Sequence, residues 1–427
     1  MRGGENFCPG VLHAVRAKDG LLIRIRVPGG LIEANQLMTI ADLSSAFADG
    51  TVEITSRANI QLRAIRHRDL EHLVEKISLA GLLPSPQHDR VRNIVTSPIA
   101  GLDTEEVIDP RPLIRQLDRR LREESVFAEL HPKFSFAIYG GARRFSQDTE
   151  DLSLEAVKFN ASPYLRLAIG GVASRFVVTC GDAVDCMLEA ARTCIRLANE
   201  FGLPVRSRRV LEIPRAMQRI LESLSSRPTP FPHPTPAPSV VEALLGIHPT
   251  TQADRVTIAP SVPLGRLTAE QAHCLAEVTR EWEGDLRLAS WRGAVLGSIP
   301  RSEVDTVVGR LHSTGLSCEG GDGFRGIAAC AGSVGCEASL ADVRSDAASL
   351  AKRLFSRAEL PGWTVNLSGC DKQCARRHGA TAELIAGPSG YTLKIKGQLA
   401  ASSCSPEFAI DAVAALHADL MSEVASL

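Results

Sequence analysis

Four cysteines near the end of the chain have the spacing of a metal-ligand set. They lie in two short segments, AACAGSVGCEASL and GCDKQCARRHG, and are Cys330, Cys336, Cys370 and Cys374. Five residues separate the first two, three separate the last two, and thirty-three lie between the pairs. Four thiolates from two loops satisfy either tetrahedral zinc or a cubane 4Fe–4S cluster. The spacing therefore predicts metal or cluster binding.

Among the possible ligands, the 4Fe–4S cluster is favoured by this spacing. Structural zinc usually takes cysteines in pairs separated by two to four residues, so the five-residue gap disfavours zinc. A cubane is larger than an ion, and the small side chains around Cys330 leave room for it. The segment behind Cys336 predicts a helix whose N-terminal end would favour a bound thiolate. Four separate core cysteines are the remaining interpretation.

Other cysteines of the chain are expected to be packing residues. Cys186 and Cys194 lie in DAVDCMLEAARTCIRLANEFG, where apolar residues follow helical spacing until Gly202. Cys180 and Cys186 repeat the six-residue step of the first ligand pair, but no second close pair follows them. We therefore predict a structural role for these three.

Composition excludes several classes of partner. The chain has 427 residues, more than one hydrophobic core usually organises, so two or more domains are expected. Its net charge of −1 creates no global field for nucleic acid or an anionic membrane. No apolar run approaches a membrane span, and MRGGENFCPG lacks the apolar core of a signal peptide. We expect a cytoplasmic protein with neither a nucleic-acid nor a membrane partner.

The chain is built from two similar halves. RPTPFPHPTPAPS, residues 227–239, has the composition of an extended polyproline linker. On either side of it, residues 27–82 resemble residues 262–316, and from Thr51 and Asp285 onward the two segments align without a gap. Such a repeat implies duplicated domains related by a pseudo-twofold axis.

Each copy predicts the same order of elements. In the first, GLLIRIRV alternates as a strand, a helix runs through Leu37, Ile40 and Phe47, strand material spans 52–65, and a second helix follows. This rhythm indicates an α+β sandwich similar to half a ferredoxin-like fold. The expected units are half-domain 1 (1–83), a cysteine-poor α/β domain (84–224), a Pro-rich linker (225–250), half-domain 2 (251–317) and the domain with the cysteine quartet (318–427).

The motifs resemble those of the sirohaem-dependent sulfite and nitrite reductases. The two cysteine segments are similar to the cluster loops of that family, and so are VPGGLI, TSRANIQL, RNIVTSP and HPKFSF elsewhere in the chain. The resemblance implies a pseudo-twofold duplicated α+β architecture with ferredoxin-like half-domains and a 4Fe–4S domain. It also implies that Cys374, the last of the four ligands, holds the position that bridges to the sirohaem iron.

The same resemblance suggests residues that bind a tetrapyrrole. Residues at the positions of Arg57, Arg92 and Lys133 clamp the carboxylates of the macrocycle in that family, and guanidinium forks suit carboxylates. Arg143 follows two glycines and is a further candidate for the same cleft. For Arg63, as for its neighbours Arg66 and Arg68, we expect a solvated strand face instead.

The resemblance is closer to one branch, the precorrin-3B synthases of aerobic cobalamin biosynthesis. FCPGVLHAVRAKDGLLIRIRVPGG and NLSGCDKQCARRHGATAELIA are similar to segments of that branch. It implies a tetrapyrrole substrate, precorrin-3A, hydroxylated with dioxygen, and reduced nicotinamide as the overall electron source. A mononuclear non-haem iron is also attributed to these enzymes. Ser135 stands where the reductases commonly have a second lysine, which agrees with this branch.

Two further interpretations stay open. The first is a sirohaem-dependent sulfite or nitrite reductase, and the second is a non-catalytic tetrapyrrole carrier, which would have no use for four cluster thiolates. No GxGxxG loop opens a dinucleotide-binding unit, so we expect electrons to arrive from a separate donor protein. The scattered histidines give no assignable ligand set for a mononuclear iron.

Overall fold

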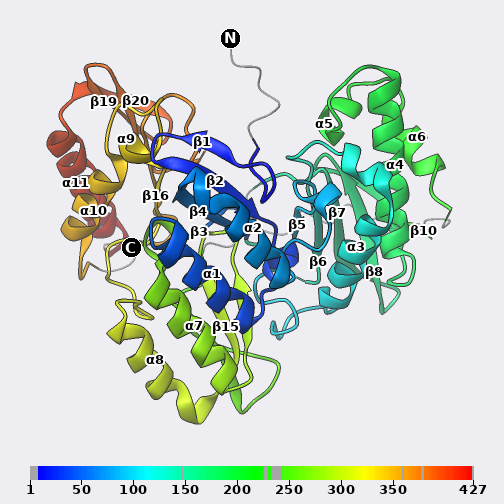
Figure 1. Cartoon of the computed structure of the whole chain (residues 1–427), viewed down its shortest axis with the longest axis horizontal. Helices are drawn as coiled ribbons and strands as arrows, with labels where there is room; N and C mark the ends of the chain where they lie inside the picture. Colours follow the sequence, from blue (N-terminus) through cyan, green and yellow to red (C-terminus); the bar gives the residue numbers. More distant parts are fainter. Residues whose placement is uncertain are drawn as a thin grey trace.

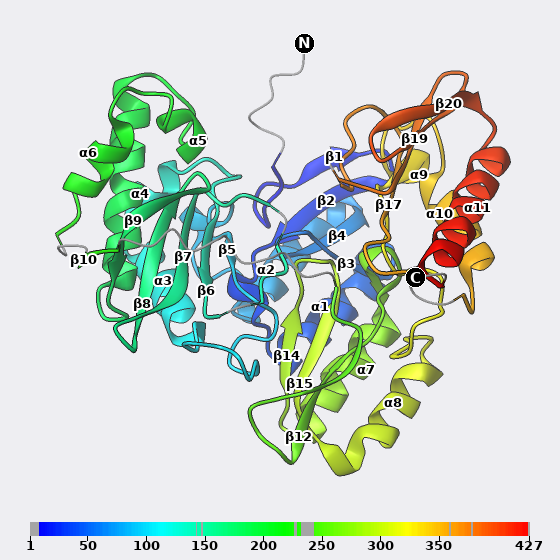
Figure 2. The ribbon, with the colours of Figure 1, turned by 180° about the vertical axis from the view of Figure 1, so that it is seen from behind.

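The computed structural model describes residues 8–141, 143–146, 148–225, 229–231, 243–357, 360–376 and 379–425. Four sheets organise them. The first half-domain, in blue, lies at the centre of the molecule (Figure 1). An N-terminal α/β domain lies on one side of it, the cysteine-bearing domain on the other, and the second half-domain beneath; the view from behind shows the same arrangement (Figure 2).

The first half-domain places two helices on one face of its sheet. Its elements are β1 (Val15–Ala17), β2 (Gly20–Ile25), α1 (Ala34–Phe47), β3 (Thr51–Ile54), β4 (Ile60–Ile65) and α2 (Leu70–Leu79). Alternation along β2 sends Ile23 and Ile25 into the core with α1 and α2. The same alternation turns Arg24 and Arg26 to the opposite face, toward the other domains.

The second half-domain shares strands and core with the first. Its main elements are β11 (Gly246–Pro249), β12 (Arg255–Ala259), α7 (Ala269–Glu281), β14 (Asp285–Leu288), β15 (Ala294–Pro300) and α8 (Val304–Ser313). Strand β13 (Arg266–Thr268) pairs with β3 of the first half, and Leu31 bridges to Arg287 of the second. Buried side chains of both halves form one hydrophobic cluster. The two halves are therefore one packed unit.

Unusual backbone conformations repeat at the same positions of both halves. Ala58 and Arg292 have φ of 54° and 68°, and Ala64 and Ser298 have φ of 57° and 58°. Each pair is matched by the gap-free alignment of the two segments. Left-handed conformations are uncommon for residues other than glycine, so their recurrence confirms the internal repeat at the level of the backbone.

The two outer domains have one topology. The N-terminal α/β domain contains β5 (Ile94–Val95), α3 (Arg111–Glu123), β6 (Phe136–Tyr139), β7 (Leu152–Phe159), β8 (Ser162–Ile169), β9 (Val172–Val178), α4 (Ala183–Glu200), α5 (Ser207–Val210) and α6 (Ala216–Glu222). The cysteine domain contains β16 (Ile327–Ala329), α9 (Gly332–Gly335), α10 (Val343–Leu354), β17 (Val365–Ser368), β18 (Ala382–Gly387), β19 (Gly390–Ile395), β20 (Gln398–Cys404) and α11 (Pro406–Ala425). In each sheet three parallel strands continue into an antiparallel meander.

Much of the expected proline linker, 226–228 and 232–242, lies outside the described residues. Its described parts belong to sheets. β10 (Thr229–Pro230) pairs with β9, and Phe231 packs beside Val157 and Val177. Residues 246–249, which we expected in the linker, form β11 at the edge of the second half-domain. Proline is tolerated in these edge strands because it need not donate to a neighbour.

Two glycines with left-handed backbones, Gly30 of VPGG and Gly50, give a matched stability prediction. Gly30 has φ of 68°, and a Cβ there would lie 2.2 Å from the backbone oxygen of Leu288. Gly50 has φ of 74°, but its Cβ would meet nothing within 4 Å. Gly50→Ala should cost about 1–2 kcal/mol for the left-handed backbone. Gly30→Ala should cost roughly 1–3 kcal/mol more, because the half-domains must separate.

Thermal unfolding followed by circular dichroism compares the two variants. A midpoint lowered equally in both would contradict the close approach of Gly30 to β14.

Candidate functional site

Two adjacent parallel strands bring the cysteine loops together. Strands β16 and β17 pair in parallel, so their carboxyl ends meet at one edge of the sheet. Cys330 directly follows β16, and its amide donates to the Leu367 carbonyl over 3.3 Å. Cys370 follows β17 after Gly369, whose amide lies 3.4 Å from the Cys330 Sγ. Cys330 and Cys370 are therefore neighbours at one edge of the sheet.

The remaining two cysteines follow tight turns on these loops. Cys336 ends α9, the single helical turn after Cys330, and its amide donates to Gly332 over 2.9 Å. The Leu340 amide donates to the Gly369 carbonyl over 2.8 Å, which ties the first loop to the second. Cys374 is the most exposed of the four and follows Gln373, which has φ of 46°.

The four cysteines offer the thiolate donor set that a 4Fe–4S cluster takes. None of the four cysteines is in a disulfide, and Cys330, Cys336 and Cys370 are only partly buried. Among the described residues, no group of three or more histidine, cysteine, aspartate or glutamate side chains is arranged to hold one metal ion. A cubane spreads its thiolate ligands more widely than zinc does. The described residues also offer no ligand set for a mononuclear iron.

The helix expected behind Cys336 begins later than we predicted. Helix α10 starts at Val343, where Asp342 accepts a hydrogen bond from the Ser345 amide as a side-chain cap. Cys336 lies instead at the end of α9. The prediction of a helix N-terminus directly at this thiol is therefore wrong, because Asp342 sets the helix start.

Cysteines in the other outer domain are packing residues, as expected. Cys186 and Cys194 are fully buried in α4, and Cys180 packs against the same core. Burial raises the pKa of both helical thiols to about 12. Such thiols stay protonated and are poor metal ligands.

Three motifs that lie far apart in the sequence meet at two buried asparagines. The Asn59 amide nitrogen lies 3.4 Å from the Asn93 Oδ1, and Asn93 donates to the carbonyls of Pro132 and Phe134, on either side of Lys133. The turn that carries Arg57 is thus joined to the Lys133 loop. The Lys133 ammonium makes no hydrogen bond or ion pair within the described part of the chain.

The four residues expected to clamp a tetrapyrrole differ in their surroundings. Arg57 is held only loosely, with Nε 3.8 Å from the Asp148 carboxylate. Arg92 forms a forked pair with Asp118 at 2.6 and 3.1 Å, and Arg143 forms one with Asp103 at 2.7 and 2.6 Å. Arg92 also lines a cavity of about 470 Å³ between the half-domains and α3. Arg57 and Lys133 are therefore the freest to bind a ligand.

A cluster of arginines that the sequence analysis missed lies where the inner face of the first half-domain meets the β14–β15 turn of the second. Arg24, Arg26 and Arg292 form no ion pair among the described residues, although Arg26 is only 3% exposed. Arg24 Nε and Arg26 Nη1 are buried without any hydrogen-bond partner. Unpaired buried charge is costly, so this cluster indicates a site for an anion.

Electrostatics supports this interpretation. Burial lowers the pKa of Arg26 to about 9, and the guanidiniums of Arg24 and Arg57 add to the effect. Burial likewise lowers the pKa of Arg24 to about 10. The pKa of Arg292 is lowered by burial, and a thiolate at Cys330 would oppose the shift. The arginine cluster and the cysteine loops therefore share one region.

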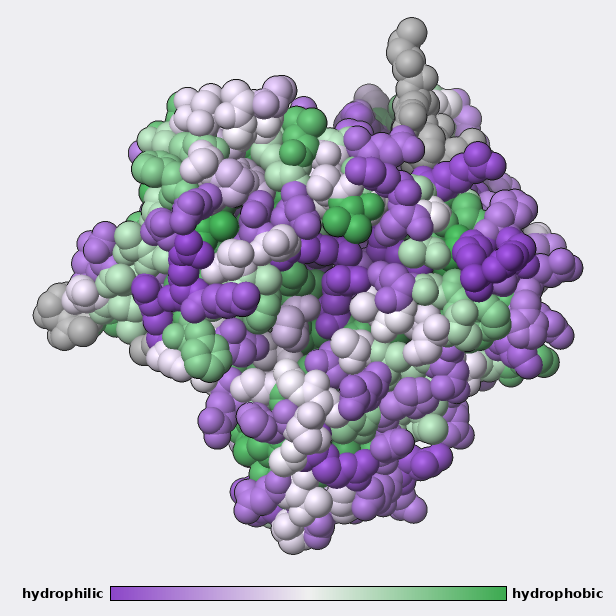
Figure 3. Space-filling view, turned by 60° about the vertical axis from the view of Figure 1, so that its left-hand side comes forward, coloured by the Kyte–Doolittle hydropathy of each residue, from purple (hydrophilic) through white to green (hydrophobic). Residues whose placement is uncertain are grey.

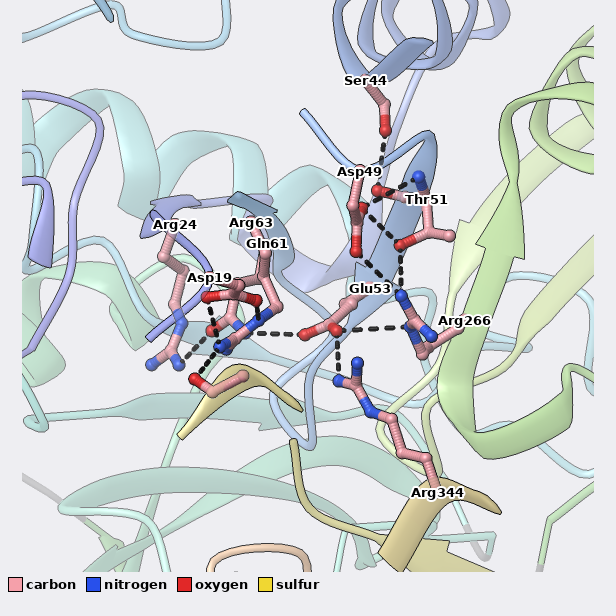
Figure 4. Close-up of polar contacts among 11 residues, drawn as sticks. Asp19, Arg24, Ser44, Asp49, Thr51, Glu53, Gln61, Arg63, Arg266 and Arg344 are labelled. Atoms are coloured by element: carbon pink, nitrogen blue, oxygen red, sulfur yellow. Dashed lines mark hydrogen bonds and ion pairs between the residues drawn. The ribbon is translucent and has the colours of Figure 1, made fainter. Parts of the chain in front are cut away.

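A polar network joins this region to its neighbours (Figure 4). Arg24 donates to Gln61 over 2.8 Å, and Gln61 donates to Glu53 over 2.7 Å. Glu53 also accepts from Arg266 of β13 and from Arg344 of α10. Hydrophilic side chains gather around a crevice near the middle of the face turned forward in Figure 3.

Two signals mark the missed arginines, one in the sequence and one in the backbone. In LLIRIRV, two cations alternate with isoleucines that are buried, and no charge of opposite sign stands beside them. A second signal is the left-handed backbone of Arg292, an unusual conformation that clusters at functional sites. Only the first can be read from residue types.

Family comparisons match the two half-domains and one outer domain. The family described as Nitrite/Sulfite reductase ferredoxin-like half domain matches residues 13–80 and 248–314. The family described as Nitrite and sulphite reductase 4Fe-4S domain matches residues 87–179, in the domain without the cysteine quartet. The structure of Mycobacterium tuberculosis NirA shares the fold, with a TM-score of 0.77 at 21% identity over 97% of this chain and 83% of that chain.

The chain belongs to the nitrite and sulfite reductase family, and the expected fold class is confirmed. Within that family it is 30% identical to precorrin-3B synthase of Sinorhizobium sp., over 93% of this chain and 83% of the relative. It is 28% identical to ferredoxin–nitrite reductase of Synechococcus elongatus, over 88% of this chain and 78% of the relative. These relatives support an oxidoreductase. Within the described residues, none of the helices combines the length and apolar character that a membrane crossing requires.

The proposed cluster ligands can be separated from the packing cysteines by matched substitutions. Cys370→Ser should abolish stoichiometric cluster iron and sulfide, because one of four thiolates is lost. Cys186→Ser should keep the cluster and lower only the stability, since this thiol is buried in α4. Iron and acid-labile sulfide are measured on anaerobically purified protein. Full iron content in Cys370→Ser would remove this residue from the ligand set.

Proposed function

We propose that this protein is an oxidoreductase of the precorrin-3B synthase type. It hydroxylates precorrin-3A at the meso carbon between rings A and D, with dioxygen, and closes a lactone with the ring A acetate. One oxygen atom enters the product and the other leaves as water. The observation that carries this proposal is the arginine cluster without ion-pair partners beside the cysteine loops.

The chain's own residues would bind and orient the substrate. A tetrapyrrole with acetate and propionate side chains presents carboxylates around its whole rim. Arg24, Arg26 and Arg292 can pair with them without giving up an internal carboxylate, and Arg57 gives up only a loose one. Lys133, held beside the Arg57 turn by Asn93, adds a further cation. Arg92 and Arg143 would have to exchange Asp118 and Asp103 for the ligand.

Electron supply is the role proposed for Cys330, Cys336, Cys370 and Cys374. A 4Fe–4S cluster held there would transfer electrons singly from a separate donor protein, with reduced nicotinamide as the ultimate source. The resemblance to precorrin-3B synthases also implies a mononuclear non-haem iron. The described residues form no group of three or more side chains that could hold that ion.

The position of Ser135 supports this activity over reduction of a small oxyanion. Ser135 is 1% exposed, and its amide donates to Asp151 over 3.1 Å. A buried serine at this position cannot supply the proton that a second lysine would give to sulfite or nitrite. Sirohaem-dependent reduction remains the second candidate, because a ferredoxin–nitrite reductase is 28% identical to the chain.

Isotopic labelling separates the two activities. Turnover of precorrin-3A under labelled dioxygen should place one labelled oxygen atom in the product, seen by mass spectrometry. The anaerobically purified protein should show the broad absorption of an iron–sulfur cluster and lack the intense bands of bound sirohaem.

Stoichiometric sirohaem, together with sulfite- or nitrite-dependent oxidation of a reduced dye, would establish the reductase instead. A protein without iron and sulfide that still binds tetrapyrrole would indicate a carrier.

Arg57, the loosely paired cation beside the arginine cluster, gives a prediction for tetrapyrrole binding. Arg57→Ala should weaken binding of sirohaem, used as a stable tetrapyrrole probe, by tenfold or more. A charge-assisted hydrogen bond contributes roughly 1.5–3 kcal/mol, and its loss leaves a ligand carboxylate unpaired. Affinity is measured by absorbance titration of the purified protein.

Arg66→Ala is the matched control, because this side chain is 57% exposed and pairs with Asp69 outside the cluster. Equal affinity of wild type, Arg57→Ala and Arg66→Ala would contradict the proposed carboxylate site.

A further inference from the structure

The single helical turn between the first two cluster cysteines is held by side chains from another domain. Lys18 Nζ, in the turn between β1 and β2, donates to the Ser333 carbonyl over 2.7 Å. Arg63 Nη2, on β4, donates to the Gly335 carbonyl over 2.5 Å. Gly335 directly precedes Cys336. Two cations of the first half-domain therefore contact the backbone of the loop that would hold the cluster.

Arg63 is fixed in place and not solvated, contrary to the expectation from its strand pattern. Its side chain is 5% exposed, and it forms a forked pair with Asp19 at 2.9 and 3.1 Å. Asp19 comes from the same β1–β2 turn as Lys18. The strand face predicted to meet water is covered by the cysteine domain, and the fork sets the direction of the remaining N–H toward Gly335.

The contact requires glycine at the loop. A Cβ on Gly335 would lie 2.6 Å from Arg63 Nη2 and 3.0 Å from Asp19 Oδ2. Any larger residue would push the guanidinium away from the carbonyl. The ion pair and the glycine are thus fitted to each other across the interface between the domains.

We propose that Arg63 is a positioning residue that sets the reduction potential of the cluster held by Cys336 and its three partners. This inference rests on the proposed 4Fe–4S site. A cluster gains negative charge on reduction, so a fixed guanidinium close to it favours the reduced state. Asp19 partly cancels that charge while it orients the fork, and Lys18 adds a weaker effect from an exposed position.

Substitutions of the ion pair should move the potential in opposite directions. Arg63→Gln removes the cation and should lower the midpoint potential of the cluster. Asp19→Asn removes the opposing anion at equal volume and should raise it. Arg63→Lys keeps the charge without the fork, so the potential should change little while iron is lost faster to a chelator.

The measurement is a redox titration of the intact, anaerobically purified protein, followed by electron paramagnetic resonance, with iron and sulfide content determined in parallel. Arg68→Gln is the matched control, because Arg68 is 74% exposed on the connection after β4 and should leave the potential unchanged. If Arg63→Gln fails to assemble a cluster, two other variants test the inference. Asp19→Asn should raise the midpoint potential, and Lys18→Met, at an exposed position, should lower it.

Shifts of the same sign in Arg63→Gln and Asp19→Asn, or no shift in either with a full cluster, would overturn the inference. Those results would leave the proposed function standing. Wild-type protein without iron and sulfide would instead overturn the cluster, and with it both proposals.

Discussion

One carboxylate, Glu53, holds together the three units around the candidate site. It accepts hydrogen bonds or ion pairs from Gln61 of its own sheet, Arg266 of the second half-domain and Arg344 of the cysteine domain (Figure 4). Its side chain is 12% exposed, so these contacts are largely shielded from water. Through Gln61 the same network reaches Arg24. The Glu53 carboxylate therefore helps to fix the position of the arginine cluster relative to the cysteine loops.

Duplication of the fold did not duplicate this chemistry. Arg287 occupies in the second half-domain the position that Glu53 occupies in the first, and it pairs with Asp285 on its own strand. On the nearby part of the second sheet, Val295 packs with Ile99 and Leu102 of the N-terminal α/β domain. One half thus meets its outer domain through ions and the other largely through apolar side chains.

The sequence predicted features that depend on neighbours along the chain and missed those that depend on contacts between domains. The repeat and the buried Cys186 follow from local spacing, and the structure shows both. The spacing of the cysteine pairs predicts a cluster site, and the first cysteine of each pair follows one of two adjacent parallel strands. The inner role of Arg63 could not be recognised, because a charged strand face is normally solvated and this side chain is covered by the loop that contains Gly335. The helix start at Val343 could have been predicted from Asp342, a good N-cap residue that precedes the apolar repeat.

The arginine cluster also affects how stability and binding are related. Arg26 is buried without an ion-pair partner, so the folded chain carries an electrostatic cost that well-packed apolar residues would avoid. The proposed anionic tetrapyrrole would neutralise this charge and bind the folded state alone, and a ligand at a hundred times its dissociation constant stabilises that state by about 2.7 kcal/mol. The unpaired charges that destabilise the folded chain are thus the ones that would favour a polycarboxylate ligand. Under the proposed function, affinity for the rim of the macrocycle and the stability of the domain junction would be two consequences of the same unpaired charges.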